Sequence, residues 1–261
     1  MNSIELFAGI GGISLAAEWA GIETKAFCEI EPFAQEVLQK HWPDVPIFDD
    51  VRTLNKLALG ERGVDVGAIE LITGGFPCQP YSIAGKQRGK DDDRDLWPQM
   101  FRVIQEIKPR WVVGENVGNF VNMELDRTLF DLESAGYEGK PIVVPASAVG
   151  ANHERYRVFV IAGEKEFLRN TDGESKLQAN SSIGSLGSHR ETWDSFTWQH
   201  RGIPSRIHWE THQPSVCRMD DGLPSGLDKG RLVALGNAVV PQQIYPIFKA
   251  IMDIEKRFSD D

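Results

Sequence analysis

The 261-residue sequence predicts an α/β protein, with a parallel β-sheet wrapped by helices and a small irregular region near the C-terminus. Two observations predict this fold class. Over the first 165 residues, short apolar segments typical of strands alternate with helical patterns, and such alternation favours parallel strands joined by helices. Between residues 166 and 230 the hydrophobic periodicity becomes poor and loop-forming residues are frequent, which indicates a separate region.

The first four elements form two strand–helix units. Residues 3–7 and 24–29 are apolar runs of strand length. Between them, residues 12–19 carry small apolar side chains on one helical face. Residues 32–42 are predicted as a helix because a proline begins the segment and a second proline follows it.

The middle of the chain continues the alternation. The apolar step at residues 47–48 predicts a short third strand, and residues 70–73 predict a buried strand. Residues 96–107 carry five apolar side chains at helical spacing. Residues 111–115 predict the next strand and residues 125–135 the next helix.

The last elements lie on either side of the irregular region. Residues 157–162 form an apolar strand that precedes it. After it, residues 231–240 are compact and apolar, and residues 243–258 carry apolar side chains at helical spacing. The sequence therefore predicts an amphipathic helix at the C-terminal end.

The composition is ordinary for a globular protein, with 41% hydrophobic and 25% charged residues. No apolar run approaches the roughly 20 residues of a membrane helix, and the first residues show no secretory signal pattern. Three cysteines provide no disulfide framework and no metal-ligand spacing, so we expect a cytoplasmic setting and no metal. The net charge of −10 argues weakly against a nucleic-acid partner, although basic loops on an acidic protein can still bind DNA.

The strongest chemical signal is Cys78, in a loop rich in glycine and proline directly after the strand at residues 70–73. A packed thiol usually lies inside a periodic apolar segment. Cys78 instead has Lys86, Arg88 and Arg94 near it in the sequence, and cationic neighbours lower the pKa of a thiol. This pattern favours a nucleophile at the carboxyl end of a strand. Cys28 and Cys217 are interpreted as structural or incidental.

A glycine-rich turn at residues 7–12 joins the first strand to the first helix. Glycines there let a ligand approach the backbone, and Glu29 stands about 20 residues on, where a ribose-binding carboxylate is expected. The pattern suits a dinucleotide or S-adenosylmethionine equally, and a tight turn without a ligand is the alternative. Asp50 could accept from an adenine amino group or belong to a solvated turn.

Glu115 directly follows a predicted strand, where apolar surroundings can raise the pKa of a carboxyl group and make it a proton donor. A turn or capping carboxylate is the alternative. Arg155 and Arg157 are predicted to point the same way on an extended segment, toward a base edge, a phosphate or acidic neighbours. The turn at residues 236–241 has a capping role by default.

Together these segments resemble the DNA (cytosine-5) methyltransferase family. The resemblance covers residues 1–163 and 231–261 and rests on five segments in the family's order: Phe7-Ala8-Gly9-Ile10-Gly11-Gly12; Pro77-Cys78-Gln79 with Ser82 and Gly85-Lys86-Gln87-Arg88-Gly89; Glu115-Asn116-Val117; His153-x-Arg155-x-Arg157; and Gly236-Asn237-Ala238-Val239. His153 stands where the family more often has glutamine, and the region before Gly236 is short.

The resemblance implies a mostly parallel, doubly wound, Rossmann-like methyltransferase sheet with helices on both faces. It assigns residues 1–165 and 231–261 to a discontinuous catalytic domain and residues 166–230 to a short target-recognition region. It implies S-adenosylmethionine as cofactor, double-stranded DNA as substrate and a companion restriction endonuclease as a candidate partner. We also expect a monomer without membrane association.

The resemblance also assigns roles to residues. Cys78 would attack C6 of a flipped cytosine, Glu115 would protonate the N3 edge, Arg157 would contact the O2 side, and Arg155 would support the site. The implied cofactor-binding residues are Phe7, Ala8, Gly9, Ile10, Gly12, Glu29, Ile30, Asp50, Val51, Pro77, Leu96, Asn237 and Ala238. The implied DNA-binding residues are Gln79, Ser82, Lys86 and Arg88.

Three other functions compete with a DNA methyltransferase. Structured RNA could be the substrate, since a relative of the family modifies a transfer RNA, although the Tyr81-Ser82 continuation resembles the DNA-acting members. A DNA-binding module without turnover would need no reactive Cys78. A nicotinamide oxidoreductase would use the glycine turn alone and gives no joint role to Cys78, Glu115 and the arginines.

Overall fold

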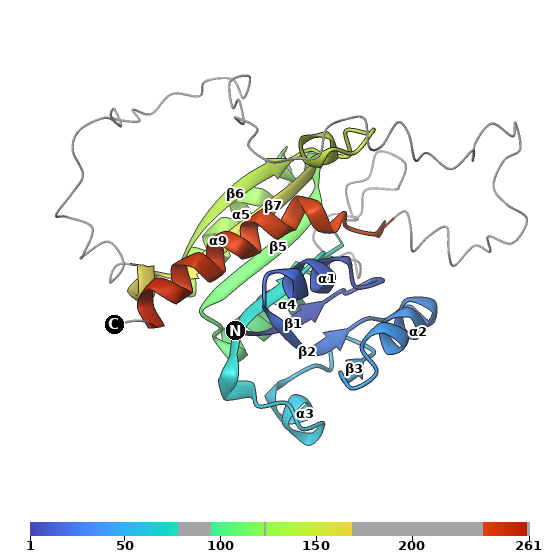
Figure 1. The fold of residues 1–261 in the computed structure, drawn as a ribbon. Coiled ribbons are helices and arrows are strands. Elements are labelled where there is room, and N and C mark those ends of the chain that lie inside the picture. The colour runs from blue at the N-terminus through green and yellow to red at the C-terminus, as the bar shows by residue number, and fades with distance from the viewer. Residues whose placement is uncertain (78–94, 123, 169–236, 260–261) are drawn as a thin grey trace, which may run out of the picture.

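The computed structural model describes residues 1–77, 95–122, 124–168 and 237–259, in which seven strands form one sheet (Figure 1). The strands are β1 (Asn2–Leu6), β2 (Glu23–Cys28), β3 (Ile47–Phe48), β4 (Ile69–Gly74), β5 (Trp111–Val117), β6 (Tyr137–Val144) and β7 (Arg157–Glu164). The helices are α1 (Gly12–Trp19), α2 (Pro32–His41), α3 (Lys56–Glu61), α4 (Trp97–Ile107), α5 (Leu125–Ser134) and α9 (Pro241–Ser259). Short 3₁₀ turns are η1 (Val66–Ala68), η3 (Gly118–Asn122) and η4 (Ala146–Val149).

The sheet has the strand order β3-β2-β1-β4-β5-β7-β6. The neighbours from β3 to β5 pair in parallel, whereas β7 is antiparallel to both β5 and β6. The predicted α/β class with a mostly parallel sheet is therefore confirmed. The chain runs outward in one direction through β1, β2 and β3 and then returns to the other side of β1 with β4, so the strand order reverses there. Ligands of open α/β sheets bind at the carboxyl ends of strands beside such a reversal.

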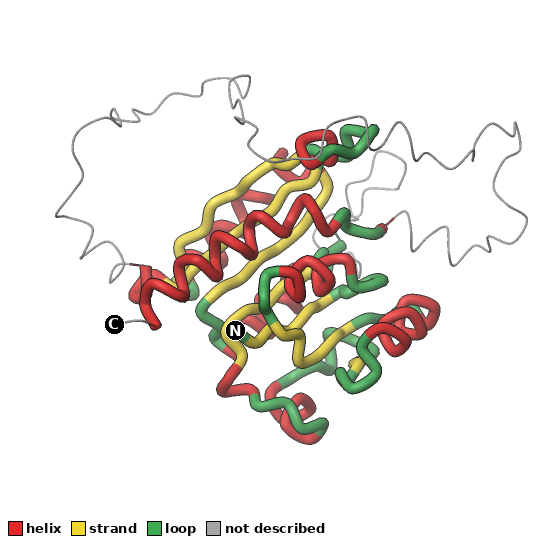
Figure 2. The backbone as a smooth tube through the Cα atoms, in the orientation of Figure 1, coloured by secondary structure: helices red, strands yellow, loops and turns green. Residues whose placement is uncertain are grey.

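Helices cover both faces of the sheet (Figure 2). On one face, α1 and α9 share a core cluster with apolar side chains of β4, β5 and β7, and α2 packs on β2. On the other face, α3, α4 and α5 pack against a larger cluster that includes Ile4, Leu6 and Ile72. This two-sided burial explains why the first half of β5 and most of β7 read as continuous apolar runs.

The C-terminal helix α9 packs on α1, the first helix of the chain. Its buried residues Ile244, Ile247, Phe248 and Ile251 follow helical spacing, as the sequence predicts. They contact the α1 side of the sheet together with Ile13, Ala16 and Ala17. The contact brings the described residues at the end of the chain against those at its beginning.

Two elements, α3 and β6, were not predicted. β6 contains Pro141 directly after Glu138, Gly139 and Lys140, and its exposed residues alternate with partly buried ones. It is also the edge strand of the sheet, a position that tolerates proline because one side of the strand has no hydrogen-bonding partner. α3 has six residues, too few to show a periodic pattern, and begins where the Asn55 side chain accepts from the Ala58 N–H.

A buried polar cluster lies between β1 and α1. Ser14 Oγ donates to a carboxyl oxygen of Glu5, and Ser14 and Thr24 hydroxyls lie 2.9 Å apart. The other Glu5 oxygen has no hydrogen-bonding partner among the described residues. Burial raises the pKa of Glu5 from about 4.5 to about 8, so its carboxyl group is protonated at neutral pH.

Replacing Glu5 with glutamine is expected to stabilise the protein increasingly as the pH rises from 5 to 8. Over that range the unfolded wild type releases a proton that the folded protein retains, which costs about 1.4 kcal/mol for each pH unit. Below the unfolded pKa both states are protonated, so the two proteins should converge there. Thermal unfolding across this pH range measures the difference. The same substitution at exposed Glu18 is the control, and a pH-independent gap between wild type and Glu5→Gln would contradict the expectation.

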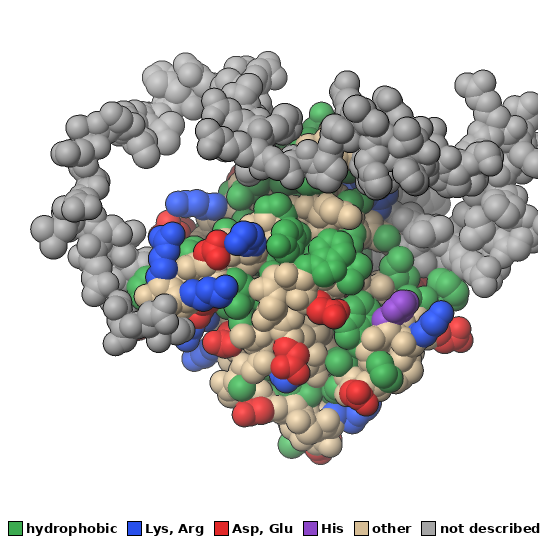
Figure 3. Space-filling view, in the orientation of Figure 1, with side chains coloured by type: hydrophobic (Ala, Val, Ile, Leu, Met, Phe, Trp, Pro, Cys, Tyr) green, Lys and Arg blue, Asp and Glu red, His purple; other side chains and the backbone are tan. Residues whose placement is uncertain are grey.

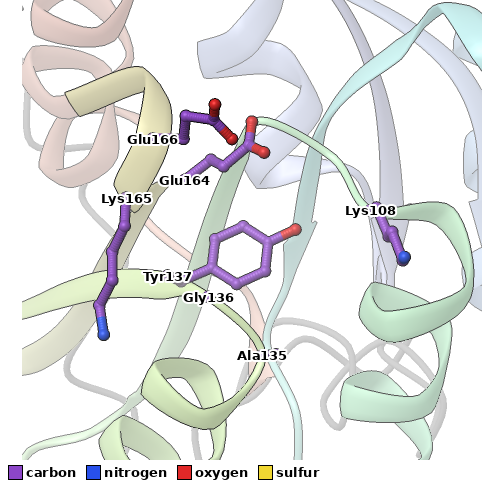
Figure 4. Close-up of a pocket in the computed structure, with 7 residues that line it drawn as sticks. All are labelled: Lys108, Ala135, Gly136, Tyr137, Glu164, Lys165 and Glu166. Atoms are coloured by element: carbon purple, nitrogen blue, oxygen red, sulfur yellow. The ribbon is translucent and has the colours of Figure 1, made fainter. Parts of the chain in front are cut away.

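Two surface features lie away from the reversal of strand order. On the face with α1 and α9, Lys and Arg side chains gather toward the C-terminal half of α9, and acidic side chains are spread below (Figure 3). A cavity of about 530 Å³ lies at the amino ends of β5 and β6, away from the carboxyl ends of the parallel strands. It is lined by Lys108, Ala135, Gly136, Tyr137, Glu164, Lys165 and Glu166 (Figure 4). Among the described residues, no helix is both long and apolar enough to cross a membrane.

Candidate active site

Four strand ends meet along one edge of the sheet. The register pairs Leu6 with both Cys28 and Gly74, Cys28 with Phe48, and Gly74 with Gly114. The loops that follow β1, β2, β3 and β4 therefore begin side by side. Most of the predicted site residues stand in these loops, so the structure brings them together.

The loop after β1 turns sharply and leaves its backbone open at one point. Phe7, Gly9 and Gly11 have positive φ angles of 55°, 55° and 82°. A Cβ built on Gly9 would meet nothing within 4 Å, whereas one on Gly12 would lie 2.6 Å from the Val239 carbonyl oxygen. Gly12 therefore permits the C-terminal segment to pack closely against the loop, while Gly9 leaves open space on the side where a Cβ would lie.

Glu29 connects the first two strand ends. Its carboxylate accepts the Gly9 N–H at 2.7 Å with one oxygen and the Glu31 N–H at 2.8 Å with the other. Each carboxylate oxygen retains a second lone pair that can accept from hydroxyl groups. Ile30, the next residue, is 60% exposed and offers an apolar surface beside that carboxylate.

The segment after β3 has a buried and an exposed part. Val51 is buried, and Asp50 caps its own turn by accepting from the Arg52 N–H at 2.9 Å. A structural role for Asp50 is therefore established, while contact with a ligand stays a prediction. Leu96 is partly buried against the core at the start of α4.

Glu115 lies inside β5, which continues to Val117, so the prediction that it follows the strand is wrong. The antiparallel partner β7 extends the pairing to Arg157 and keeps this stretch in the sheet. The Glu115 carboxylate is buried, and a Cβ on Gly75 would lie 2.9 Å from it. The carboxylate therefore stands against the backbone that leads from β4 toward Cys78.

Burial raises the pKa of Glu115 to about 7, against the opposing effect of Arg157 and Arg155. Arg157 Nε lies 2.7 Å from a Glu115 oxygen. Near neutral pH this carboxyl group exists in both protonation states, as general acid–base catalysis requires.

The two arginines do not share an extended segment, so that prediction is wrong. Arg155 has a positive φ of 31° and precedes β7, whereas Arg157 is the first residue of the strand. Arg155 Nη2 donates to the Ala238 carbonyl at 2.6 Å. Burial and then the charge of Arg157 lower the pKa of Arg155, while Glu115 opposes this. Both guanidinium groups thus interact with Glu115, from different backbone conformations.

Asn116 anchors the chain that leads to Cys78, a role the sequence did not reveal. Its buried side chain donates to the Phe76 carbonyl at 2.9 Å, and its oxygen accepts the Val117 N–H. Phe76 packs against Trp97 with ring centroids 5.1 Å apart. Pro77 is thereby held at the end of β4.

The C-terminal segment reaches the same edge of the sheet. Ala238 is partly buried and Asn237 exposed. Gln243 in α9 is buried and donates to two backbone carbonyls near Arg155, another role that the sequence did not reveal.

The predicted nucleophile Cys78 and the predicted DNA-binding residues Gln79, Ser82, Lys86 and Arg88 lie outside the described residues. Cys28 is buried, and burial raises the pKa of its thiol to about 12. A thiolate at Cys28 is therefore disfavoured at neutral pH. The described part of the chain holds no group of three or more His, Cys, Asp or Glu side chains arranged for a metal ion.

Comparisons with known proteins bear on this arrangement. The family described as C-5 cytosine-specific DNA methylase matches residues 1–218. The chain is 35% identical over 171 residues to the Type II methyltransferase M.NgoMIV of Neisseria gonorrhoeae, covering 64% of this chain and 53% of the relative. It is 32% identical over 192 residues to the Type II methyltransferase M.HhaI of Haemophilus parahaemolyticus, covering 71% and 56%.

A solved structure from E. coli, described as a DNA modification methyltransferase encoded within a prophage, superposes with a TM-score of 0.56 at 32% identity. The match covers 64% of this chain and 48% of that structure. The chain therefore spans about half the length of the curated relatives and of the solved structure that it matches.

Proposed function

The chain belongs to the C-5 cytosine-specific DNA methylase family, and we propose that it methylates C5 of cytosine in double-stranded DNA. The methyl donor is S-adenosylmethionine, and the reaction passes through a covalent bond between Cys78 and C6 of a flipped base. The observation that carries this proposal is the buried Glu115–Arg157 pair against Gly75, three residues before Cys78. It supplies an acid and a cation where a thiol adduct of cytosine would need them.

The proposed mechanism assigns one task to each group. The Cys78 thiolate adds to C6, which makes C5 nucleophilic. Glu115 donates a proton to N3, so that negative charge does not build up on the ring as the thiolate attacks. Arg157 contacts the O2 side, and Arg155 supports it. After C5 has taken the methyl group, a base removes the C5 proton, Cys78 leaves C6 as the thiolate, and the N3 proton returns to Glu115.

The target carbon is stacked inside a duplex, so the base must rotate out to reach Cys78. Gln79, Ser82, Lys86 and Arg88 would contact the DNA around the opened position. Sequence is read by side chains that reach base edges. Residues 166–230 are proposed to carry the side chains that do this.

The residues at the four strand ends fit S-adenosylmethionine. Gly9 leaves open space over its backbone, and the Glu29 carboxylate is fixed beside it with lone pairs free for ribose hydroxyls. Bound there, S-adenosylmethionine would supply an electrophilic methyl group. The remaining residues proposed to hold it are Phe7, Ala8, Ile10, Gly12, Ile30, Asp50, Val51, Pro77, Leu96, Asn237 and Ala238.

Replacing Phe7 with alanine is expected to weaken S-adenosylmethionine binding about tenfold or more and to change DNA binding much less. Phe7 begins the loop after β1, and stacking of an aromatic ring on adenine contributes roughly 1–3 kcal/mol. Isothermal titration with the donor and a fluorescence assay with duplex DNA measure the two affinities. Phe130→Ala, which removes a ring that is 71% exposed on α5, is the control. An unchanged donor affinity in a folded Phe7→Ala protein would contradict the assignment of this loop.

The function is tested by incubating the protein with labelled S-adenosylmethionine and varied duplexes. Label on C5 of cytosine is the expected result. Absence of transfer to every duplex by a folded protein that binds the donor would overturn the proposal. Transfer to structured RNA alone would assign the chemistry to a different substrate, and bisulfite sequencing of DNA from expressing cells would identify the target sites.

We further propose that the protein acts as a monomer in the cytoplasm, alongside a companion restriction endonuclease. The proposal of an endonuclease is supported by relatives that are named Type II methyltransferases.

A further inference from the structure

We infer that Gln243 is a positioning residue for the reaction centre: its carboxamide holds the backbone at Arg155 and thereby sets both arginines relative to Glu115. This inference rests on the proposed function, in which Glu115 and Arg157 contact the target base. Gln243 itself lies in α9 and contacts neither Glu115 nor Arg157 through any recorded hydrogen bond among the described residues.

The Gln243 side chain binds both ends of the segment that connects β6 to β7. Its Nε2 donates to the Val144 carbonyl at 2.7 Å and to the Arg155 carbonyl at 3.1 Å. Val144 ends β6, and Arg155 comes two residues before β7 begins. Both N–H donors of the amide are used, which fixes the segment between the strands to the first turn of α9.

Arg155 needs such support because of its backbone. Its positive φ of 31° is a conformation that residues other than glycine rarely adopt, and it persists only where surroundings enforce it. With the Arg155 carbonyl held by Gln243, the Arg155 guanidinium reaches the Ala238 carbonyl at 2.6 Å. Two residues later Arg157 reaches Glu115 at 2.7 Å.

The energetics favour positioning over stability as the reason for glutamine here. Gln243 is 1% exposed, and its Oε1 has no hydrogen-bonding partner among the described residues. Burying an unpaired amide oxygen is unfavourable, and an apolar side chain of similar volume would avoid that cost. What the amide provides is the pair of donors to Val144 and Arg155.

The test compares Gln243→Met, which preserves side-chain length but removes both donors, with Gln242→Met. Gln242 is the preceding residue in α9 and is exposed. If Gln243 positions the arginines, Gln243→Met lowers kcat about tenfold, since small misplacements of catalytic groups are costly. The pH at which Glu115 titrates also rises by at least about half a unit, because the arginines oppose the effect of burial on this group.

Carbon-13 NMR of labelled glutamate follows the Glu115 titration without any turnover, and Glu115→Gln identifies its signal. An inactive wild type would defeat the proposed function while leaving this readout intact. An active wild type, with Gln243→Met unchanged in Glu115 titration and within twofold in kcat, would overturn the positioning role even if its melting temperature fell. If Gln243→Met does not fold, Gln243→Leu replaces it: the apolar side chain cannot donate to either carbonyl, so the same two shifts are expected, and their absence overturns the inference.

Discussion

Replacing Cys78 with alanine is expected to abolish methyl transfer, by at least about a thousandfold, while S-adenosylmethionine binding stays within a few-fold of wild type. The nucleophile makes the bond on which the reaction depends, so its loss removes the reaction path. Most of the residues proposed to bind the cofactor lie on other strand ends, with Gly9 and Glu29 joined directly to each other. Label transfer to duplex DNA and calorimetric donor titration measure the two effects.

Duplex DNA that contains 5-fluorocytosine gives a second measurement. Fluorine at C5 cannot leave as a proton does, so wild type should remain covalently attached, whereas Cys78→Ala should not. Cys28→Ala and Cys217→Ala are controls that should still form the adduct, since the Cys28 thiol is buried with a pKa of about 12. An adduct formed by Cys78→Ala would place the nucleophile elsewhere, and loss of donor binding in this variant would indicate that the loop is structural.

Replacing Glu115 with glutamine is expected to lower kcat by about 10² to 10⁴-fold, the usual contribution of general acid–base catalysis. Burial raises the pKa of Glu115 to about 7, so its protonated fraction falls as the pH rises through that value. Wild-type kcat/KM should therefore decline above about pH 7, because the Glu115 carboxyl group ionises and can no longer donate its proton. Glutamine can donate a hydrogen bond but not a proton, so the residual activity should lack this decline.

The measurement is the pH dependence of kcat/KM between pH 6 and 9, for wild type and Glu115→Gln. Glu133→Gln, at an exposed position on α5, should retain the wild-type profile. Glu115→Gln keeps the size of the side chain beside Gly75 and Arg157, so folding should be preserved. A variant with full activity, or one with the same decline as wild type, would remove Glu115 from the role of proton donor.

The sequence predicted the sheet because its strands are buried on both faces. Val112 and Val160 face one helical layer while their neighbours Val113 and Phe159 face the other, and the resulting apolar runs are visible without a structure. β6 was missed because its exposed edge position permits proline and charged residues. An edge strand is defined by its neighbours in space, which a local pattern does not reveal.

The candidate site was predictable where residue type carried the chemistry. Glu29 stands out in the sequence by its distance from the glycine turn, and the structure joins it to Gly9. Gln243 and Asn116 act through backbone carbonyls that lie 88 and 40 positions away in the chain. No spacing rule links an amide to a distant carbonyl, so such contacts emerge only from the folded structure.

The close approach of Gly12 to the Val239 carbonyl has a consequence for biosynthesis. The ribosome makes the loop after β1 well before the segment that precedes α9, yet the Val239 carbonyl of that segment packs against Gly12 at the end of the loop. Contacts between such distant parts of a chain form late, because closing the long intervening loop is entropically costly. The loop after β1 is therefore incomplete in the nascent protein until α9 has left the exit tunnel and docked on α1.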